Sequence, residues 1–189
     1  MKIEGEVRGV VFQTDAKYVL EKEGEEGLKK LEKRVRELGY PIDYRTVEAL
    51  NFYPLGLRGI SLLLIKDTFG CGDEEIREMG YAAPQTSFIV KLLVKFSADW
   101  KKFISEIPGI WIKHWTRGKI EVPKTDEKTK EVVLRLKDVK IHPILCLYLE
   151  GYFKRIYEFV VGKGKGEVKE TKCMFKGDPY HEYVVTIKG

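Results

Sequence analysis

The sequence predicts an α+β fold in which a helical N-terminal part packs on an antiparallel sheet. Two observations support this prediction. Apolar residues follow helical spacing in the first part of the chain, whereas the last part shows two strand pairs that flank one long apolar helix. Helices and strands are therefore segregated along the chain, and a doubly wound parallel sheet would instead need them to alternate.

The first 110 residues are expected to be mainly helical. The opening stretch IEGEVRGVVF alternates enough to be a strand. The next segment places Leu28, Leu31, Val35 and Leu38 on one helix face, with charged residues elsewhere.

Three further helical segments are expected before residue 110. Residues 46–70 are mainly apolar and interrupted by Pro and Gly, which predicts a short helix, a bend and a buried helix. Asp73 is a candidate N-cap of a two-turn helix that Gly80 would end. Residues 84–109 predict one or two helices buried over much of their girth.

The last part of the chain predicts two hairpins around a helix. KIEVP and EVVLRLKDV form the first hairpin, and Pro143 lies near the first position of the helix HPILCLYLEGYFKRIYEFVVG. The connector GKGKG leads into EVKETKCMF and YHEYVVTIKG, which turn at KGDP. We interpret residues 1–189 as a single domain, with a mainly helical part over 1–110 and an α+β part over 111–189.

Charge and hydropathy exclude several classes of protein. The net charge of +5 is interleaved, as in EKEGEEGLKKLEKRVRELG, so we expect no nucleic-acid partner. The most apolar run, ISLLLI, is too short to span a membrane, and the N-terminus lacks the apolar core of a signal peptide. We therefore expect a cytoplasmic protein, and the abundance of Lys and Glu is consistent with a thermophile.

Trp111, His114 and Trp115 form one candidate ligand-binding group. The imidazole is able to hydrogen-bond a ligand inside an aromatic pocket. The alternative is a helix end whose tryptophans fill the core.

Cys146, Glu170, Cys173 and His181 form a candidate metal site, since Zn²⁺ prefers thiolate, imidazole and carboxylate ligands. A three-residue turn over 177–179 would place Cys173 and His181 on one sheet face. Glu170 could join them only across a bulge or a bend, because an offset of three reverses the face. Cys146 would have to come from the preceding helix, and the alternative for it is a small buried core residue.

The chain from Trp111 to its end resembles the 4-vinyl reductase domain. The resemblance is carried by IWIKHWTRGKIEV, CLYLEGYFKRI and VKETKCMFKGDPYHEYVV. In that family E-x-x-C precedes a Gly-Asp turn, a second Cys and an aromatic residue. Glu170 and Cys173 match the first element, Gly177-Asp178 match the turn and Tyr183 matches the aromatic.

The resemblance implies that zinc is a possible cofactor. In phenol-sensing regulators of the family, a helix Cys and E-x-x-C-x7-C bind zinc, and these positions fall on Cys146, Glu170, Cys173 and His181. His181 stands where the family has Cys, and zinc accepts either ligand.

The same superfamily includes haem nitric-oxide sensors, and the sequence argues against haem. Those sensors need a proximal His on a mid-chain helix and a Tyr-x-Ser-x-Arg motif. SFIVKLLVKFSADWKKF contains no His, and EVVLRLKD lacks the Tyr and the Ser.

Three functions follow from the resemblance. The first is a sensor-like domain with a pocket for a small apolar or aromatic molecule, which signals through an unknown protein partner. The second is a homodimeric scaffold like the TRAPP vesicle-tethering subunits, which also belong to the superfamily. The third, a reductase, is the weakest because the sequence lacks a nucleotide-binding fingerprint.

Overall fold

The computed structural model describes residues 3–86 and 100–188. The described helices are α1 (Val10–Glu37), α2 (Gly56–Phe69), α3 (Asp73–Thr86), α5 (Trp100–His114), α6 (Ile144–Val161) and a short 3-10 helix, η1 (Met174–Lys176). The described strands are β1 (Glu6–Arg8), β2 (Phe52–Pro54), β3 (Lys119–Asp126), β4 (Glu131–Lys137), β5 (Gly166–Lys172) and β6 (His181–Ile187). This mixture confirms the predicted α+β class.

The main sheet has four antiparallel strands in the order β3-β4-β6-β5. Its two halves are the two predicted hairpins, and they join because β4 pairs with β6, with Leu134 opposite Tyr183 and Leu136 opposite His181. A second, two-stranded sheet pairs β1 with β2. The prediction of two hairpins that flank a long helix and form one antiparallel sheet is therefore confirmed.

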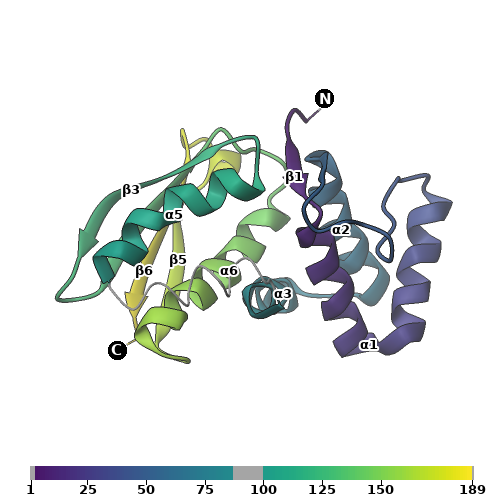
Figure 1. Ribbon diagram of the computed structural model, residues 1–189, viewed down its shortest axis with the longest axis horizontal. Helices are drawn as coiled ribbons and strands as arrows, with labels where there is room; N and C mark the ends of the chain where they lie inside the picture. Colours follow the sequence, from purple (N-terminus) through teal and green to yellow (C-terminus); the bar gives the residue numbers. More distant parts are fainter. Residues whose placement is uncertain (1–2, 87–99, 189) are drawn as a thin grey trace.

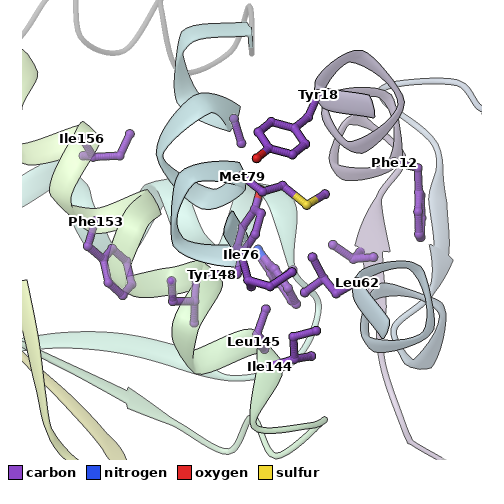
Figure 2. Packing of buried hydrophobic residues seen from close by; sticks show 14 of the residues in the cluster. Phe12, Tyr18, Leu62, Ile76, Met79, Ile144, Leu145, Tyr148, Phe153 and Ile156 are labelled. Atoms are coloured by element: carbon purple, nitrogen blue, oxygen red, sulfur yellow. The ribbon is translucent and has the colours of Figure 1, made fainter. Parts of the chain in front are cut away.

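The helix α6 lies between the N-terminal helices and the sheet. Figure 1 shows α1 and α2 at one end of the molecule, α3 and α6 in the middle, and the sheet with α5 at the other end. Figure 2 shows Ile76 and Met79 of α3 beside Tyr148 and Leu145 of α6, and all four side chains are buried. The N-terminal helices therefore reach the sheet largely through α6.

Two glycines let α3 and α6 approach closely. A Cβ at Gly80 would meet the backbone oxygen of Tyr148 at 1.9 Å, and a Cβ at Gly151 would meet that of Arg77 at 1.9 Å. The expectation that Gly80 ends its helix is wrong, since α3 continues to Thr86. Gly80 serves the contact between the helices and not their termination.

The first helix is longer than the sequence indicates. Only Glu6–Arg8 of the predicted strand is extended, and α1 begins at Val10. Gly24, with φ 69° and ψ −170°, kinks α1 between two helical halves. Of the predicted apolar face, Leu28, Leu31 and Val35 are buried, and Leu38 is 45% exposed.

The predictions for residues 46–109 hold in part. The short helix is replaced by β2, whereas the buried helix after the bend is present as α2. Of the one or two helices predicted over residues 84–109, residues 84–86 lie in α3 and residues 100–109 in α5, whereas residues 87–99 lie outside the described residues. No described helix is long and apolar enough to cross a membrane.

A buried ion pair joins α1 to α2. Arg58 donates to a carboxylate oxygen of Asp15, and the Ser61 hydroxyl donates to the same oxygen at 2.6 Å. Neither Asp15 nor Arg58 is exposed, and the guanidinium lies 4.3 Å from the ring centroid of Tyr148 on α6. The pair thus ties the two N-terminal helices to the central helix.

Candidate functional site

The C-terminal end of α5 is held against β1. The backbone of Trp115 forms a bridge with Val7, and the amide of Thr116 donates to the Glu6 oxygen at 3.0 Å. The Arg8 guanidinium donates to the Lys113 oxygen at 3.0 Å. These bonds fix the position of His114, the last residue of α5.

His114 presents a free nitrogen lone pair inside the protein. Its Nδ1 donates to the carbonyl oxygen of Ile110 at 2.9 Å, because a carbonyl can only accept. Its Nε2 is buried and has no hydrogen-bond partner among the described residues. Burial, together with the nearby cations Arg8 and Lys113, lowers the pKa of His114, so the imidazole is neutral at pH 7 with its lone pair on Nε2.

A cavity of about 40 Å³ lies beside His114. A second cavity of about 40 Å³ lies between α5, α6 and the sheet, and its walls are almost entirely apolar. Tyr152 of α6 lines both cavities. The first cavity is lined by Val10, Val11, Thr14, Ala83, His114, Trp115, Tyr148, Leu149 and Tyr152.

The structure places Trp111, His114 and Trp115 around these cavities. The two tryptophan rings stack with centroids 4.6 Å apart, and both side chains are buried. Trp115 and His114 line the first cavity, whereas Trp111 lines the second and donates from Nε1 to the Arg117 oxygen at 3.1 Å. Both tryptophans fill the core, and a role in ligand binding stays a prediction.

The four predicted metal ligands lie together. One donor atom from each of Cys146, Glu170, Cys173 and His181 lies within 4.8 Å of every other. The two sulfurs are 3.9 Å apart, and Cys146 Sγ is 3.6 Å from His181 Nδ1. Tetrahedral zinc with its usual bond lengths has edges of about 3.8 Å between two sulfurs and about 3.6 Å between sulfur and nitrogen.

The contact between His181 and Glu170 brings two hydrogen-bond acceptors together. Its Nε2 donates to the carbonyl oxygen of Val139 at 3.1 Å, so a neutral imidazole carries its lone pair on Nδ1. That Nδ1 lies 2.9 Å from Glu170 Oε1, which also accepts. A proton or a metal cation between them resolves this contact, and the Nε2 bond is the outer support that metal-binding imidazoles commonly have.

In the β5–β6 hairpin the predicted bulge is present, whereas the turn differs from the prediction. β5 ends at Lys172, and η1 lengthens the connection, so the three-residue turn is wrong. The pairing shifts between Glu170 and Lys172, which is the bulge that Glu170 needed to reach the site. Asp178 supports the turn, accepting from the Cys173 amide at 2.8 Å.

The cluster is closed to additional ligands. Cys146, Cys173 and His181 are buried, and the space beside them has no room for a water molecule. Burial, then the neighbouring Glu170 and Cys173, raises the pKa of the Cys146 thiol. A site with four protein ligands and no open position has the form of a structural metal centre.

Comparison with known proteins identifies the fold. No protein-family model and no curated protein matches the sequence. Among solved structures, an H-NOX protein from S. oneidensis in its Fe(II)NO state matches with a TM-score of 0.68 at 14% identity, covering 96% of this chain and 99% of that chain. The chain has the H-NOX fold.

Two further solved structures agree. A doubly substituted Tt H-NOX has a TM-score of 0.69 at 14% identity, with 96% of this chain and 95% of that chain covered. An H-NOX domain variant from Shewanella oneidensis in the Fe(II)CO state has a TM-score of 0.67 at 15% identity, with 96% and 99% covered. These identities establish the fold alone. They support the haem-nitric-oxide-binding part of the resemblance and not its 4-vinyl reductase or TRAPP part.

The sequence motifs predict that the protein does not bind haem, and the H-NOX structures contradict this prediction. Solved chains that share this fold over nearly their whole length are described in an Fe(II)NO ligation state, by the redox potential of their haem or by its distortion. The exclusion relied on motifs, and much of the segment searched for a proximal His, residues 87–99, lies outside the described residues. The shared fold, and not the missing motifs, therefore decides that haem has to be tested.

The described residues offer one imidazole to a haem. His114 Nε2 is buried, neutral and without a partner there, as an axial ligand nitrogen must be. The stretch EVVLR keeps only the Arg of the Tyr-x-Ser-x-Arg motif. This residue is Arg135, and its guanidinium donates to a carboxylate oxygen of Glu182 at 2.8 Å. Each cavity is far smaller than a porphyrin, so neither accommodates haem without rearrangement of the helices around it.

Sequence reasoning missed most of the cavity wall. Tyr148, Leu149 and Tyr152 come from α6, and Val10 and Thr14 come from α1. The α6 residues belong to the long apolar helix that the sequence predicts, and nothing in its pattern marks them as a cavity wall. The sequence carries no signal that brings the start of α1 to the end of α5.

Proposed function

We propose that the protein is a sensor-like, small-molecule-binding domain whose ligand occupies the cavity beside His114. The observation that carries this proposal is the buried Nε2 of His114, which has no hydrogen-bond partner among the described residues. A buried acceptor left without a partner costs about 1–3 kcal/mol, and a bound ligand that supplies a donor or a metal atom removes this cost. The signal then passes to a protein partner.

The cavity walls define the ligand class. They are mostly apolar, with Trp115, Tyr148 and Tyr152 as aromatic surfaces and His114 as a neutral acceptor. An apolar or aromatic molecule with one hydrogen-bond donor, or with a metal atom, suits these walls. Movement of the Tyr152 side chain joins the two cavities and makes room for a ligand larger than either holds alone.

Haem is the first ligand to test. H-NOX structures that carry it share the fold, and His114 would hold its iron while Trp115, Tyr148 and Tyr152 contact the ring. Bound haem supplies an iron atom to which a diatomic gas can bind. The chain's own contribution is a neutral imidazole in a mostly apolar site.

Titration of the purified protein with hemin tests the proposal. We expect saturable binding with a shifted Soret band, and a weaker, spectrally different complex for His114→Ala. His142→Ala is the matched control, because its imidazole at the start of α6 lies outside both cavities. A fluorescent apolar probe, titrated in parallel, reports on ligands other than haem. Failure of the wild type to bind either compound better than His114→Ala would contradict the proposal.

We propose further that Cys146, Glu170, Cys173 and His181 bind a structural zinc ion. The acceptor-to-acceptor contact of His181 with Glu170 and the near-tetrahedral spacing of sulfur and nitrogen support it. The metal would join α6 to the β5–β6 hairpin. Elemental analysis of protein purified without chelators tests this, with about one zinc per chain expected. Absence of zinc, combined with no uptake of added zinc, would contradict it.

Cys173→Ser and His181→Ala should each lose the metal. Cys71→Ser is the matched control, since Cys71 is a partly buried loop cysteine outside the cluster. We expect it to keep the zinc content of the wild type.

A further inference from the structure

Tyr183 of β6 lies beside the proposed metal centre, since it borders the same small space as Cys146 and His181, yet none of the interactions described so far uses its hydroxyl. It is directly opposite Glu170 of β5 in the sheet, and it is two residues from His181 on its own strand. Cross-strand partners and residues two apart share a sheet face. Tyr183, Glu170 and His181 therefore all point toward α6, which carries Cys146.

The hydroxyl of Tyr183 is buried without a partner. The side chain is fully buried, and its Oη has no hydrogen-bond partner among the described residues. A buried hydroxyl in that state is costly and rare in folded proteins. Its ring is well accommodated, in an edge-to-face contact with Phe153 at a centroid distance of 5.0 Å. The structure thus accounts for the ring and leaves the hydroxyl unexplained.

The space beside this side chain is lined by residues of the proposed metal centre. Tyr183 borders the same small space as Cys146 and His181, and it lies opposite Glu170 in the sheet. A phenol carries its proton at neutral pH and can donate it to an acceptor. A neutral thiol is a weak acceptor, whereas a metal-bound thiolate is a strong one.

We propose that Tyr183 is a positioning residue of the metal centre, whose hydroxyl donates a hydrogen bond to the sulfur of Cys146 when that sulfur is a metal-bound thiolate. This inference rests on the proposed metal centre. When the metal binds, the S–H bond of Cys146 breaks, the proton leaves to solvent and a sulfur–metal bond forms. Tyr183 keeps its own proton and shares it with the remaining lone pairs of the sulfur.

The hydrogen bond has two consequences. It orients the Cys146 sulfur toward the ion, and loss of such an outer contact typically weakens metal affinity about 10-fold to 100-fold. It also draws electron density from the sulfur, which raises the energy of charge transfer from thiolate to metal. A residue that served only to fill space would leave the charge-transfer energy unchanged.

Cobalt titration of the metal-free full chain tests the inference, because Co²⁺ takes tetrahedral sites of this kind and its spectrum reports on the thiolates. The variant is Tyr183→Phe, which keeps the ring and its contact with Phe153. The matched control is Tyr157→Phe, which removes a hydroxyl that donates to the Lys130 oxygen at 2.7 Å, outside the cluster. Competition with a chelator gives the affinities for Co²⁺ and Zn²⁺.

We expect Tyr183→Phe to bind both ions about 10-fold to 100-fold more weakly, with its thiolate-to-cobalt band at lower energy. Tyr157→Phe should match the wild type. In the wild type, zinc should also shift the ultraviolet absorption of tyrosine, a measurement that does not depend on the folding of any variant. This shift should be absent in Tyr183→Phe.

Two results would overturn the inference, and they differ. If the wild type binds cobalt and Tyr183→Phe has the same affinity and the same band, then the role of Tyr183 is wrong and the metal centre stands. If the wild type binds neither cobalt nor zinc, then the metal centre itself is wrong, and the inference fails with it.

Discussion

At the scale of single residues, the buried ion pair of Asp15 and Arg58 links the N-terminal helices α1 and α2. Both side chains are fully buried, and burial raises the pKa of Asp15 against the opposing effect of Arg58. Removal of one partner leaves an uncompensated charge in the core. Removal of both partners leaves none, and it is therefore expected to cost less.

We predict that Arg58→Met and Asp15→Leu each lower the free energy of unfolding by about 3–5 kcal/mol. The double variant should lose clearly less than the sum of the two single losses. Urea denaturation of the four proteins measures this cycle. Additive losses would show that the two charges do not interact.

His114 gives a prediction of how stability depends on pH. Its pKa is lowered in the folded protein, so the unfolded chain binds more protons below pH about 6.5. The stability that His114 contributes is complete above that pH. It is lost as the pH falls toward the folded-state pKa, by at most about 1.4 kcal/mol per pH unit.

We therefore expect the wild type to lose stability relative to His114→Gln as the pH is lowered from 7.5 to 5.5. Thermal or urea unfolding across this range measures the difference. A difference that stays constant with pH would show that His114 is protonated equally well in the folded protein.

At the scale of elements, the contact between α3 and α6 depends on glycine. Any side chain at Gly151 collides with the backbone oxygen of Arg77, and backbone cannot rotate away as a side chain can. This contact sets the position of α6, whose other residues line the cavity and carry Cys146.

We predict that Gly151→Ala destabilises the protein by about 2 kcal/mol or more, although alanine is the better helix former. Gly109→Ala in α5 is the matched control, since a Cβ there meets nothing within 4 Å. It should be neutral or stabilise by up to about 1 kcal/mol. Chemical denaturation measures both, and equal effects would remove the close contact as the cause.

The sequence predicts the elements better where their pattern is local. The two hairpins and α6 follow from alternation, turn residues and Pro143, and all three are present. Gly80 shows the limit, because the sequence does not reveal whether a glycine ends a helix or admits a neighbouring backbone. The start of α1 shows it too, because IEGEVRGVVF is compatible with both a strand and a helix.

The sequence predicts which residues form the candidate metal site, but it does not predict how the chain arranges them in space. The spacing of Glu170, Cys173 and His181 limits the options to a hairpin with a bulge, and the bulge is present. The turn was predicted wrongly because nothing in KGDP specifies the 3-10 turn that precedes it. The contact of Val139 with His181 depends on pairing between separate hairpins, and the approach of Tyr183 to Cys146 depends on the packing of α6 on the sheet, neither of which a local pattern encodes.

At the scale of the whole molecule, α6 connects the two proposed sites. One set of its residues, including Leu149 and Tyr152, lines the ligand cavity, and Cys146 lies in the metal cluster. Leu149 borders both the cavity and the space beside the cluster. The metal centre is therefore expected to stabilise the helix that forms the cavity wall.

We predict that removal of the metal lowers the stability of the whole chain. At a zinc concentration of 100 times its dissociation constant, binding contributes about 2.7 kcal/mol. Thermal unfolding with and without a chelator should therefore show a lower midpoint for the metal-free protein. Cys173→Ser should show no such difference, and a wild type insensitive to the chelator would exclude a structural role for the metal.

Ligand binding at His114 is decided by native mass spectrometry of the wild type and His114→Ala, each purified from cells supplied with a haem precursor. The wild type should carry the mass of a non-covalently bound small molecule, released at higher collision energy, that is absent or strongly reduced in His114→Ala. Equal masses for the two proteins, with no bound molecule on either, would mean that the free nitrogen of His114 does not mark a ligand site.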